Sequence, residues 1–373
     1  MVHEMRGRSF DEGDGSGGDG GSSAVIGQPM PLVFNGRAGE YFGIWIVNVL
    51  LTVLTVGIYS AWAKVRTNRY FWGSTRLDGD AFSYHAKPLQ ILIARIIVIA
   101  VLVGVGVLVD MRPIAAFVVY PAFLFLFPWL VARSFRFQSR VTRWRNVNFD
   151  FRTDYWPTFL TLLIVPFIPI ISLGLATPVA TKLTQEWAYN RFSFGDRPFK
   201  VDVSLGRLYG LFGLVFVLAI VAYGAALASL IPVILEADNS GGGLGALGPG
   251  GYLSLAVAYV LLLSVSLLVL VYQVGVRNIV FSELTLDGIH KFQSTVSKTR
   301  YVWIVVTNLF AVAFTLGLLT PWARIRLARY IAENTYIIPG GPLDEFVANV
   351  KETQGVIGEE YVDIEGIDVG IGL

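Results

Sequence analysis

The sequence contains no cysteine and few charged residues. Without Cys among its 373 residues, it cannot form disulfides, thiolate nucleophiles or cysteine-ligated metal sites. Its three histidines form no His-Glu-x-x-His zinc pattern. A net charge of +2 at pH 7 gives no basis for nucleic-acid binding. We therefore expect a protein that is not an enzyme and has no metal, no cofactor and no nucleic-acid partner.

Charged residues make up 15% of the chain, against about 25% in an average soluble protein. Hydrophobic residues make up 54% and are concentrated in seven long runs. Each run reaches or approaches the roughly 20 residues that a helix needs to cross about 30 Å of hydrocarbon. Because a soluble core cannot absorb so many, the sequence predicts a polytopic integral membrane protein. The runs are 43–61, 89–109, 113–132, 157–180, 208–235, 252–274 and 302–323.

A motif of polar, aromatic and basic residues occurs twice without a gap, from Asn48 to Tyr70 and from Asn308 to Tyr330. A divergent third copy includes Ser172 to Pro178 and lacks the arginines of the other two. Such a match inside apolar runs is not expected by chance and indicates internal repeats. The predicted fold is an all-α polytopic helical bundle with pseudo-repeats and small strand-like cytoplasmic elements.

The expected organisation has five parts. A Gly- and Asp-rich tail over 1–31 is expected to be disordered. Repeat unit one covers 32–143, unit two 146–273, and a shortened unit three 277–338. An acidic tail follows over 339–373, with an amphipathic helix expected at 342–354 and an extended or disordered end.

Short alternating segments occur before the motif runs, and alternation with period two is typical of strands. They include Leu32–Gly36, Asn148–Phe151, Asn278–Phe281 and Leu284–Leu286. A glycine pair, Gly206 and Gly210, together with Gly213 and Gly224, predicts a close helix-packing face.

The basic residues allow two topologies. Loops 64–88, 133–156, 182–207 and 276–301 are all rich in Lys and Arg, so seven crossings would violate the positive-inside tendency. Four crossings, with the three motif runs re-entering from the cytoplasm, would place both termini and every Arg-rich loop inside. Pro166 and Pro169 would then mark the re-entrant tip of unit two, since proline interrupts a helix. Seven crossings with some translocated basic loops remain the alternative.

Three motif segments resemble a known family. They are Phe34-x-Gly36, the run from Asn48 to Tyr59, and Trp62-Ala-Lys-Val-Arg66-x-x-Arg69-Tyr70. The match continues from Thr75 to Tyr84 and ends at Gly372-Leu373. These residues resemble the YjgN family of bacterial inner-membrane proteins, which is defined by a domain of unknown function. The resemblance implies a multi-pass protein of the bacterial plasma membrane and brings no substrate or catalytic residues.

Two groups of motif residues are candidate sites. Polar side chains inside apolar runs either line a pathway or bond between repeats. These are Asn48, Thr52, Thr55, Asn308 and Thr315. Tryptophan next to basic residues either anchors a helix at the interface or binds anionic lipid headgroups or phosphate. These are Trp62, Lys64, Arg66, Arg69, Trp322, Arg324, Arg326 and Arg329.

Two functions from different classes follow. The first is a transporter or channel-like protein for a small or amphipathic solute. The alternative is a non-transporting scaffold or anionic-lipid-binding protein whose acidic tail recruits a soluble partner. A cavity lined by Asn48, Thr52 and Asn308 would favour transport, and a dry packed centre would favour the alternative. The sequence does not determine the oligomeric state.

Overall fold

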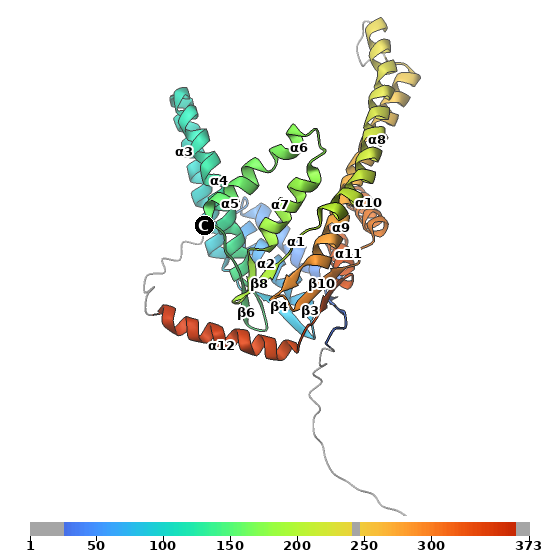
Figure 1. Ribbon diagram of the computed structural model, residues 1–373. Helices are drawn as coiled ribbons and strands as arrows, with labels where there is room; N and C mark the ends of the chain where they lie inside the picture. Colours follow the sequence, from blue (N-terminus) through green and yellow to red (C-terminus); the bar gives the residue numbers. More distant parts are fainter. Residues whose placement is uncertain (1–25, 241–246, 363–373) are drawn as a thin grey trace, which may run out of the picture.

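The structure is a computed structural model that describes residues 26–240 and 247–362, and these are mostly helical. Four of the helices are long and apolar enough to cross a membrane. They form two tall hairpins, which we call the arms (Figure 1). One arm joins α3 (Pro88–Met111) to α4 (Ala116–Arg140) through a 3-10 turn at Pro113–Ala115. The other joins α8 (Leu205–Ser240) to α9 (Pro249–Glu283).

The close helix contact in the second arm is not at the predicted glycine pair. A side chain at Gly210 would meet nothing within 4 Å. A side chain at Gly275 of α9 would instead overlap Leu211 of α8. The prediction from Gly206 and Gly210 is therefore wrong, because a glycine spacing does not say which helix faces it.

The three motif runs each fold back on themselves and form what we call the short hairpins. The first pairs α1 (Ala38–Leu54) with α2 (Ser60–Ser74), and the third pairs α10 (Lys298–Phe314) with α11 (Thr320–Glu333). The second is more broken. Its ascending side consists of α5 (Tyr155–Phe159), a π-helical turn (Leu160–Ile164) and α6 (Phe167–Ile171), and its descending side is α7 (Thr177–Tyr189).

The tips of the short hairpins share one backbone turn. At each tip a residue with φ near +50° precedes a glycine with φ near +90°: Val56–Gly57, Leu173–Gly174 and Leu316–Gly317. The glycine N–H donates to the carbonyl five residues earlier, as in a Schellman cap, with N···O distances of 2.7 to 2.8 Å. The tip of the second hairpin was predicted at Pro166 and Pro169. The helix is interrupted there, but the chain reverses at Leu173–Gly174, because only there does the backbone enter the left-handed region.

The segments between the helical hairpins form an eleven-stranded antiparallel sheet, so the all-α prediction is only partly correct. Its order runs from β1 through β11 and down to β2. Only Leu32 separates β1 (Met30–Pro31) from β2 (Val33–Phe34), so the sheet closes through the chain and we call it the ring. The other strands are β3 (Thr75–Leu77), β4 (Asp80–Tyr84), β5 (Thr142–Trp144), β6 (Val147–Phe151), β7 (Phe192–Phe194), β8 (Arg197–Lys200), β9 (Thr285–Leu286), β10 (His290–Ser294) and β11 (Thr335–Ile338).

The ring alternates tight turns with helical hairpins. Strands β4 and β5 flank one arm, β8 and β9 flank the other, and the short hairpins connect the remaining neighbours along the chain. The last seam joins β1 to β11, with Met30 opposite Ile337. Two sequence expectations change as a result. Met30 and Pro31, placed in the disordered tail, are a strand, and Asn278–Phe281, expected as a strand, lies in α9.

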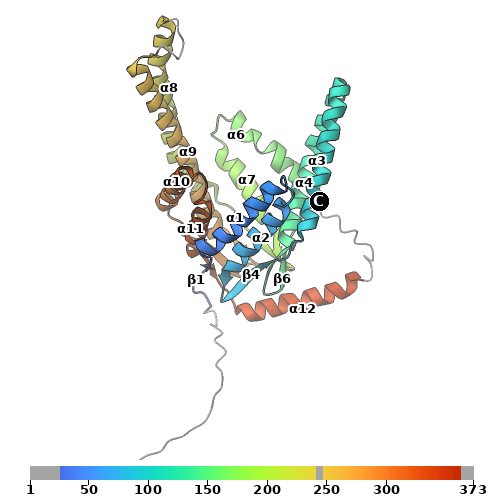
Figure 2. The same ribbon diagram turned by 180° about the vertical axis from the view of Figure 1, so that it is seen from behind.

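The lumen of the ring is the main core. Alternate strands contribute one buried apolar layer: Leu77, Trp144, Phe194, Leu286 and Ile337. On the side away from the arms, α12 (Leu343–Val362) lies across the ring, as both views show (Figures 1 and 2). Its apolar face packs into this layer through Leu343, Phe346, Val347 and Val350. The expected amphipathic helix is therefore present and longer than predicted, while the expected extended end lies outside the described residues.

A cluster of charged residues attaches α12 to the ring. Arg145, in the turn between β5 and β6, bonds Asp344 of α12 at 2.8 Å, Asp78 at 3.0 Å and Asp80 at 2.5 Å. Its guanidinium also lies over the Trp144 ring, 4.7 Å from the centroid. The beginning of α12 is thus held by charge as well as by apolar packing.

Candidate functional site

The candidate pathway residues bond within their own hairpins. Asn48 Nδ2 donates to the Ala63 carbonyl at 3.5 Å, and Asn308 Nδ2 donates to the Ala323 carbonyl at 3.0 Å. Each bond joins the ascending helix to the descending helix of one short hairpin. Thr52 donates to the Asn48 carbonyl at 2.6 Å. The hydrogen bonds of these side chains therefore stabilise the hairpin itself.

Thr55 and Thr315 close the tips. Each hydroxyl donates to the carbonyl four residues earlier at 2.7 Å. Each also accepts the N–H four residues later, from Tyr59 at 2.9 Å or Leu319 at 3.1 Å. None of the five candidate pathway residues lines any of the four cavities described below.

Two of the motif arginines hold the chain where it leaves the ring. Arg69 donates to the carbonyls of Tyr84 and Ala86, both at 3.3 Å. Arg329 donates to the Gly36 carbonyl at 2.9 Å. Arg329 belongs to the third hairpin and Gly36 precedes the first, so this bond helps to bring the two ends of the ring together.

Other motif residues differ in their surroundings. Trp62 stacks on Tyr59 with centroids 6.1 Å apart, and Arg324 bonds the Tyr41 hydroxyl at 3.1 Å. Lys64 and Arg66 are exposed.

A basic groove of about 530 Å³ lies between the beginning of α1 and the third hairpin. It is lined by Arg37, Ala38, Arg300, Trp303, Ile304, Trp322, Ile325, Arg326, Arg329, Tyr330 and Glu333. Four guanidinium groups therefore meet one carboxylate. The groove contains three of the predicted headgroup residues, and we refer to it as the basic groove.

The arginines of the basic groove differ in their hydrogen bonds and in their exposure. Arg326 is half-buried, bonds Thr307 at 2.7 Å and Asn308 Oδ1 at 3.0 Å, and lies over the Trp322 ring. Arg37 and Arg300 are exposed. Their guanidinium groups can reach an anion in the groove while Arg326 fixes its wall. Oxygens of a phosphate or carboxylate fit such a set of donors.

A second cavity with two cationic groups lies at the first hairpin. It measures about 340 Å³, and its lining includes Lys64 of α2 and Arg95 of α3 among apolar residues. Arg95 donates to Ser60 Oγ at 2.5 Å, which ties an arm to the neighbouring tip. Lys64 was predicted as a headgroup contact, and Arg95 is the second cationic residue that lines this cavity.

The groove contains residues that the sequence did not single out. Arg37, Arg300 and Trp303 enter it only because α1 and α10 pack beside α11. One local signal existed, since Arg300 and Trp303 are three residues apart and share a helix face. Nothing local relates Arg37 to a helix 290 residues away.

The membrane-length arms and the apolar short hairpins define this chain as a helical membrane protein. It belongs to the family described as bacterial proteins of unknown function (DUF898), whose model matches residues 29–364. It is similar to the inner membrane protein YjgN of Salmonella typhimurium, with 25% identity over 347 residues, 82% of this chain and 88% of that protein. It is also similar to the inner membrane protein YjgN of Escherichia coli K12, with 24% identity over 375 residues, 87% of this chain and 92% of that protein. No solved structure matches it. The family resemblance inferred from the motifs is thereby confirmed.

Proposed function

We propose that this protein binds anionic phospholipid headgroups at the cytoplasmic surface of the bacterial inner membrane. The observation that carries the proposal is the basic groove, where four arginines and two tryptophans face one carboxylate. Tryptophan is favoured at the headgroup level, and arginine binds the phosphates there.

The short hairpins support this placement. Helix α1 has 17 residues and, at 1.5 Å per residue, is about 25 Å long, less than the roughly 30 Å of hydrocarbon. The tips are apolar and unprotected, with Val56 93% exposed, Leu173 86% and Leu316 95%. Entry of these side chains into hydrocarbon is favourable, because it removes their apolar surface from water. In this proposal, the short hairpins enter the membrane and return to the side from which they entered.

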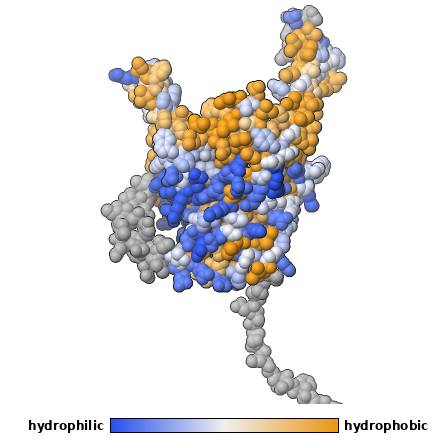
Figure 3. Space-filling view, viewed as in Figure 1, coloured by the Kyte–Doolittle hydropathy of each residue, from blue (hydrophilic) through white to orange (hydrophobic). Residues whose placement is uncertain are grey.

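The surface pattern supports the same orientation. Apolar residues gather on the arms and on the body between them, and hydrophilic residues cover much of the body below (Figure 3). The arms and short hairpins rise from one side of the ring (Figure 1). Two arms that each cross twice, together with three re-entrant hairpins, would leave the ring and α12 in the cytoplasm. The basic residues on that side agree with the positive-inside tendency.

We include the internal repeat in this proposal. The three tips share one turn, and Asn48 and Asn308 make equivalent bonds in the first and third hairpins. The second hairpin has Leu183 and Glu186 where the first has Arg66 and Arg69. Lipid binding by the motif arginines is accordingly assigned to the outer two hairpins.

The test measures lipid retention. Purified protein would be equilibrated with vesicles of phosphatidylglycerol and phosphatidylcholine, and the retained lipids would be counted by native mass spectrometry. We expect Arg37→Gln with Arg300→Gln to weaken phosphatidylglycerol binding about 30-fold, since each basic residue near an anionic surface contributes about 1 kcal/mol. Arg76→Gln with Lys351→Gln removes the same charge from exposed positions outside the groove and should change little. Equal loss in both pairs would contradict a specific site.

Transport of a small or amphipathic solute is the second candidate. The observation that favours it is a central apolar cavity, described below, between the arms and the lumen of the ring. Solute-dependent flux into vesicles containing the purified protein would support transport, and lipid retention without flux would leave the headgroup-binding role alone. Recruitment of a soluble partner by the acidic tail also stays a prediction.

A further inference from the structure

A central cavity of about 470 Å³ lies on the arm side of the ring, and we call it the aromatic chamber. Nine of its thirteen lining residues are aromatic. Its walls come from the ring-side ends of α2, α4, α7 and α9, including Trp72, Phe135, Tyr189 and Phe281. These helices belong to the arms and short hairpins, so the chamber lies between the elements that carry the apolar surface.

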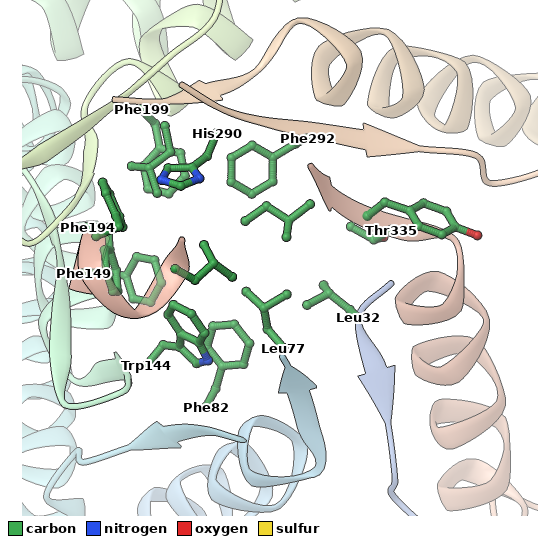
Figure 4. A pocket seen from close by; sticks show the side chains of 15 residues that line it. Leu32, Leu77, Phe82, Trp144, Phe149, Phe194, Phe199, His290, Phe292 and Thr335 are labelled. Carbon is green, nitrogen blue, oxygen red and sulfur yellow. The ribbon is translucent and has the colours of Figure 1, made fainter. Parts of the chain in front are cut away.

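The floor of the aromatic chamber is a layer of four phenylalanines. Phe82, Phe149, Phe199 and Phe292 come from β4, β6, β8 and β10, and neighbouring rings lie 5.8 to 6.5 Å apart. The same four residues line the smaller lumen cavity of about 110 Å³ that faces α12 (Figure 4). They therefore separate the two cavities and close the chamber on the ring side.

The Ser and Thr hydroxyls in the lining of the aromatic chamber both bond to carbonyls of α4. Ser139 donates to the Phe135 carbonyl at 2.8 Å, and Thr142 donates to the Gln138 carbonyl at 3.0 Å. Water needs two to four polar partners to be held in a buried site. A cavity of this size with an apolar lining is typical of sites for apolar ligands.

A cationic cavity adjoins the chamber. Gln138 lines both the aromatic chamber and the cavity that contains Lys64 and Arg95. Cationic donors on one side of Gln138 and an apolar space on the other match the two ends of an amphipathic anion. This juxtaposition selects a lipid over a plain hydrocarbon.

We propose that the aromatic chamber holds one acyl chain of a membrane phospholipid whose phosphate lies at Lys64 and Arg95. This site is separate from the basic groove and goes beyond the proposed headgroup binding there. Because the chamber lies at the ring-side ends of the helices, the bound chain leaves the bilayer to enter it. The protein then acts on the lipid chain as well as on its headgroup.

The experiment uses chain-labelled lipid and the full-length protein in vesicles. A phosphatidylglycerol with a diazirine in one acyl chain would be photolysed, and the modified residues would be mapped by mass spectrometry. We expect adducts at chamber residues such as Phe135 and Phe281. Adducts confined to the outer faces of the arms would overturn the proposal. A diazirine-labelled free fatty acid is used in a parallel experiment. Stronger chamber labelling by the fatty acid than by the phospholipid would overturn the assignment to a phospholipid.

The chain has no cysteine, so a single cysteine introduced in the chamber can be modified selectively after the protein has folded. Ser139→Cys is nearly isosteric, and reaction with a dodecyl methanethiosulfonate would place a chain in the chamber. We expect chamber adducts to fall at least tenfold. Ser264→Cys is the matched control, since Ser264 also donates to its own helix, at 2.6 Å, and lines none of the four cavities. Absence of reaction at Ser139→Cys, or undiminished adducts after it, would contradict the proposal.

The two sites fail independently. Lys64→Gln with Arg95→Gln should lower chamber adducts and leave retention at the basic groove unchanged. Arg37→Gln with Arg300→Gln should do the reverse. Loss of chamber adducts in the groove variant would show that a single site had been counted twice.

Discussion

At the scale of single residues, the two buried asparagines hold the short hairpins together. Replacing either with alanine removes the side-chain bond that joins the two helices of a hairpin, which costs about 0.5–1.5 kcal/mol. Asn308 also accepts from Arg326, whereas Asn48 Oδ1 has no partner among the described residues. We expect Asn308→Ala to destabilise more than Asn48→Ala. Thermal unfolding in detergent checks this, with exposed Asn35→Ala as the control. Loss of transport with unchanged stability would instead favour pathway lining.

His290 gives the contact between the ring and α12 a pH dependence. It is fully buried, its ring lies 4.4 Å from that of Phe346, and its Nδ1 accepts the Gly340 N–H at 3.3 Å. Burial lowers the pKa of His290, and the smaller opposing effect of Asp287 does not compensate. The unfolded chain therefore binds a proton more readily than the folded one, and stability is lost as the pH falls.

We expect the unfolding temperature to decrease between pH 7.5 and 5.5, as an unfolded histidine with a pKa of about 6.5 becomes protonated. His290→Gln should remove that part of the decrease. The pKa of Asp150 is lowered, because bonds from Arg152 and Arg140 outweigh burial. The stability that Asp150 contributes is therefore lost only below about pH 4, outside this range. An unchanged pH profile in His290→Gln would assign the dependence to other groups.

The sequence predicted part of the candidate site at this scale. Aligning the motif copies singled out Trp322, Arg326 and Arg329, which share the basic groove. It did not distinguish Arg326, which is bonded to Asn308, from exposed Arg66. That difference depends on side-chain conformation, which a motif does not specify.

At the scale of elements, each short hairpin depends on the glycine at its tip. Gly57 and Gly317 have φ of +91° and +93°, in the left-handed region where other residues are strained by about 1–2 kcal/mol. Gly57→Ala and Gly317→Ala should each destabilise the protein by about 1 kcal/mol or more. Gly210→Ala on α8 is the matched control, because it is helical with open space and should be neutral or slightly stabilising. Thermal unfolding of all three separates a tip effect from loss of glycine itself.

The elements were predicted unequally well. The arms follow directly from four long apolar runs, whereas the one tip that was predicted, at Pro166 and Pro169, lies instead at Leu173–Gly174. Most strands were missed because they have two to five residues, shorter than the windows in which alternation is informative. Pairing across a whole helical hairpin stabilises them, and such pairing has no local signal.

At the scale of the whole molecule, the proposed topology can be tested with single cysteines. Arg112 and Asp238 lie at the far ends of the two arms, whereas Arg37 and Lys291 lie by the ring, and all four are exposed. In intact cells, a membrane-impermeant thiol reagent should label Arg112→Cys and Asp238→Cys only. Labelling of Arg37→Cys or Lys291→Cys would place the ring outside the cytoplasm.

The molecule as a whole was beyond the sequence for a physical reason. The aromatic chamber and the lumen are built from residues contributed singly by many short strands and helix ends. Each phenylalanine of the floor is unremarkable in its own segment. Only closure of the ring brings them to one axis.

Closure of the ring also depends on the order in which its strands are synthesised. The seam between β1 and β11 joins Met30 to Ile337, 307 residues further along the chain. At 5–20 residues per second, the ribosome needs about 15–60 s to travel that distance. Both arms and all three short hairpins emerge before the first strand can meet its partner. The nascent protein therefore spends this interval as an open ribbon with an unpaired edge, which is the period in which it most needs protection from aggregation.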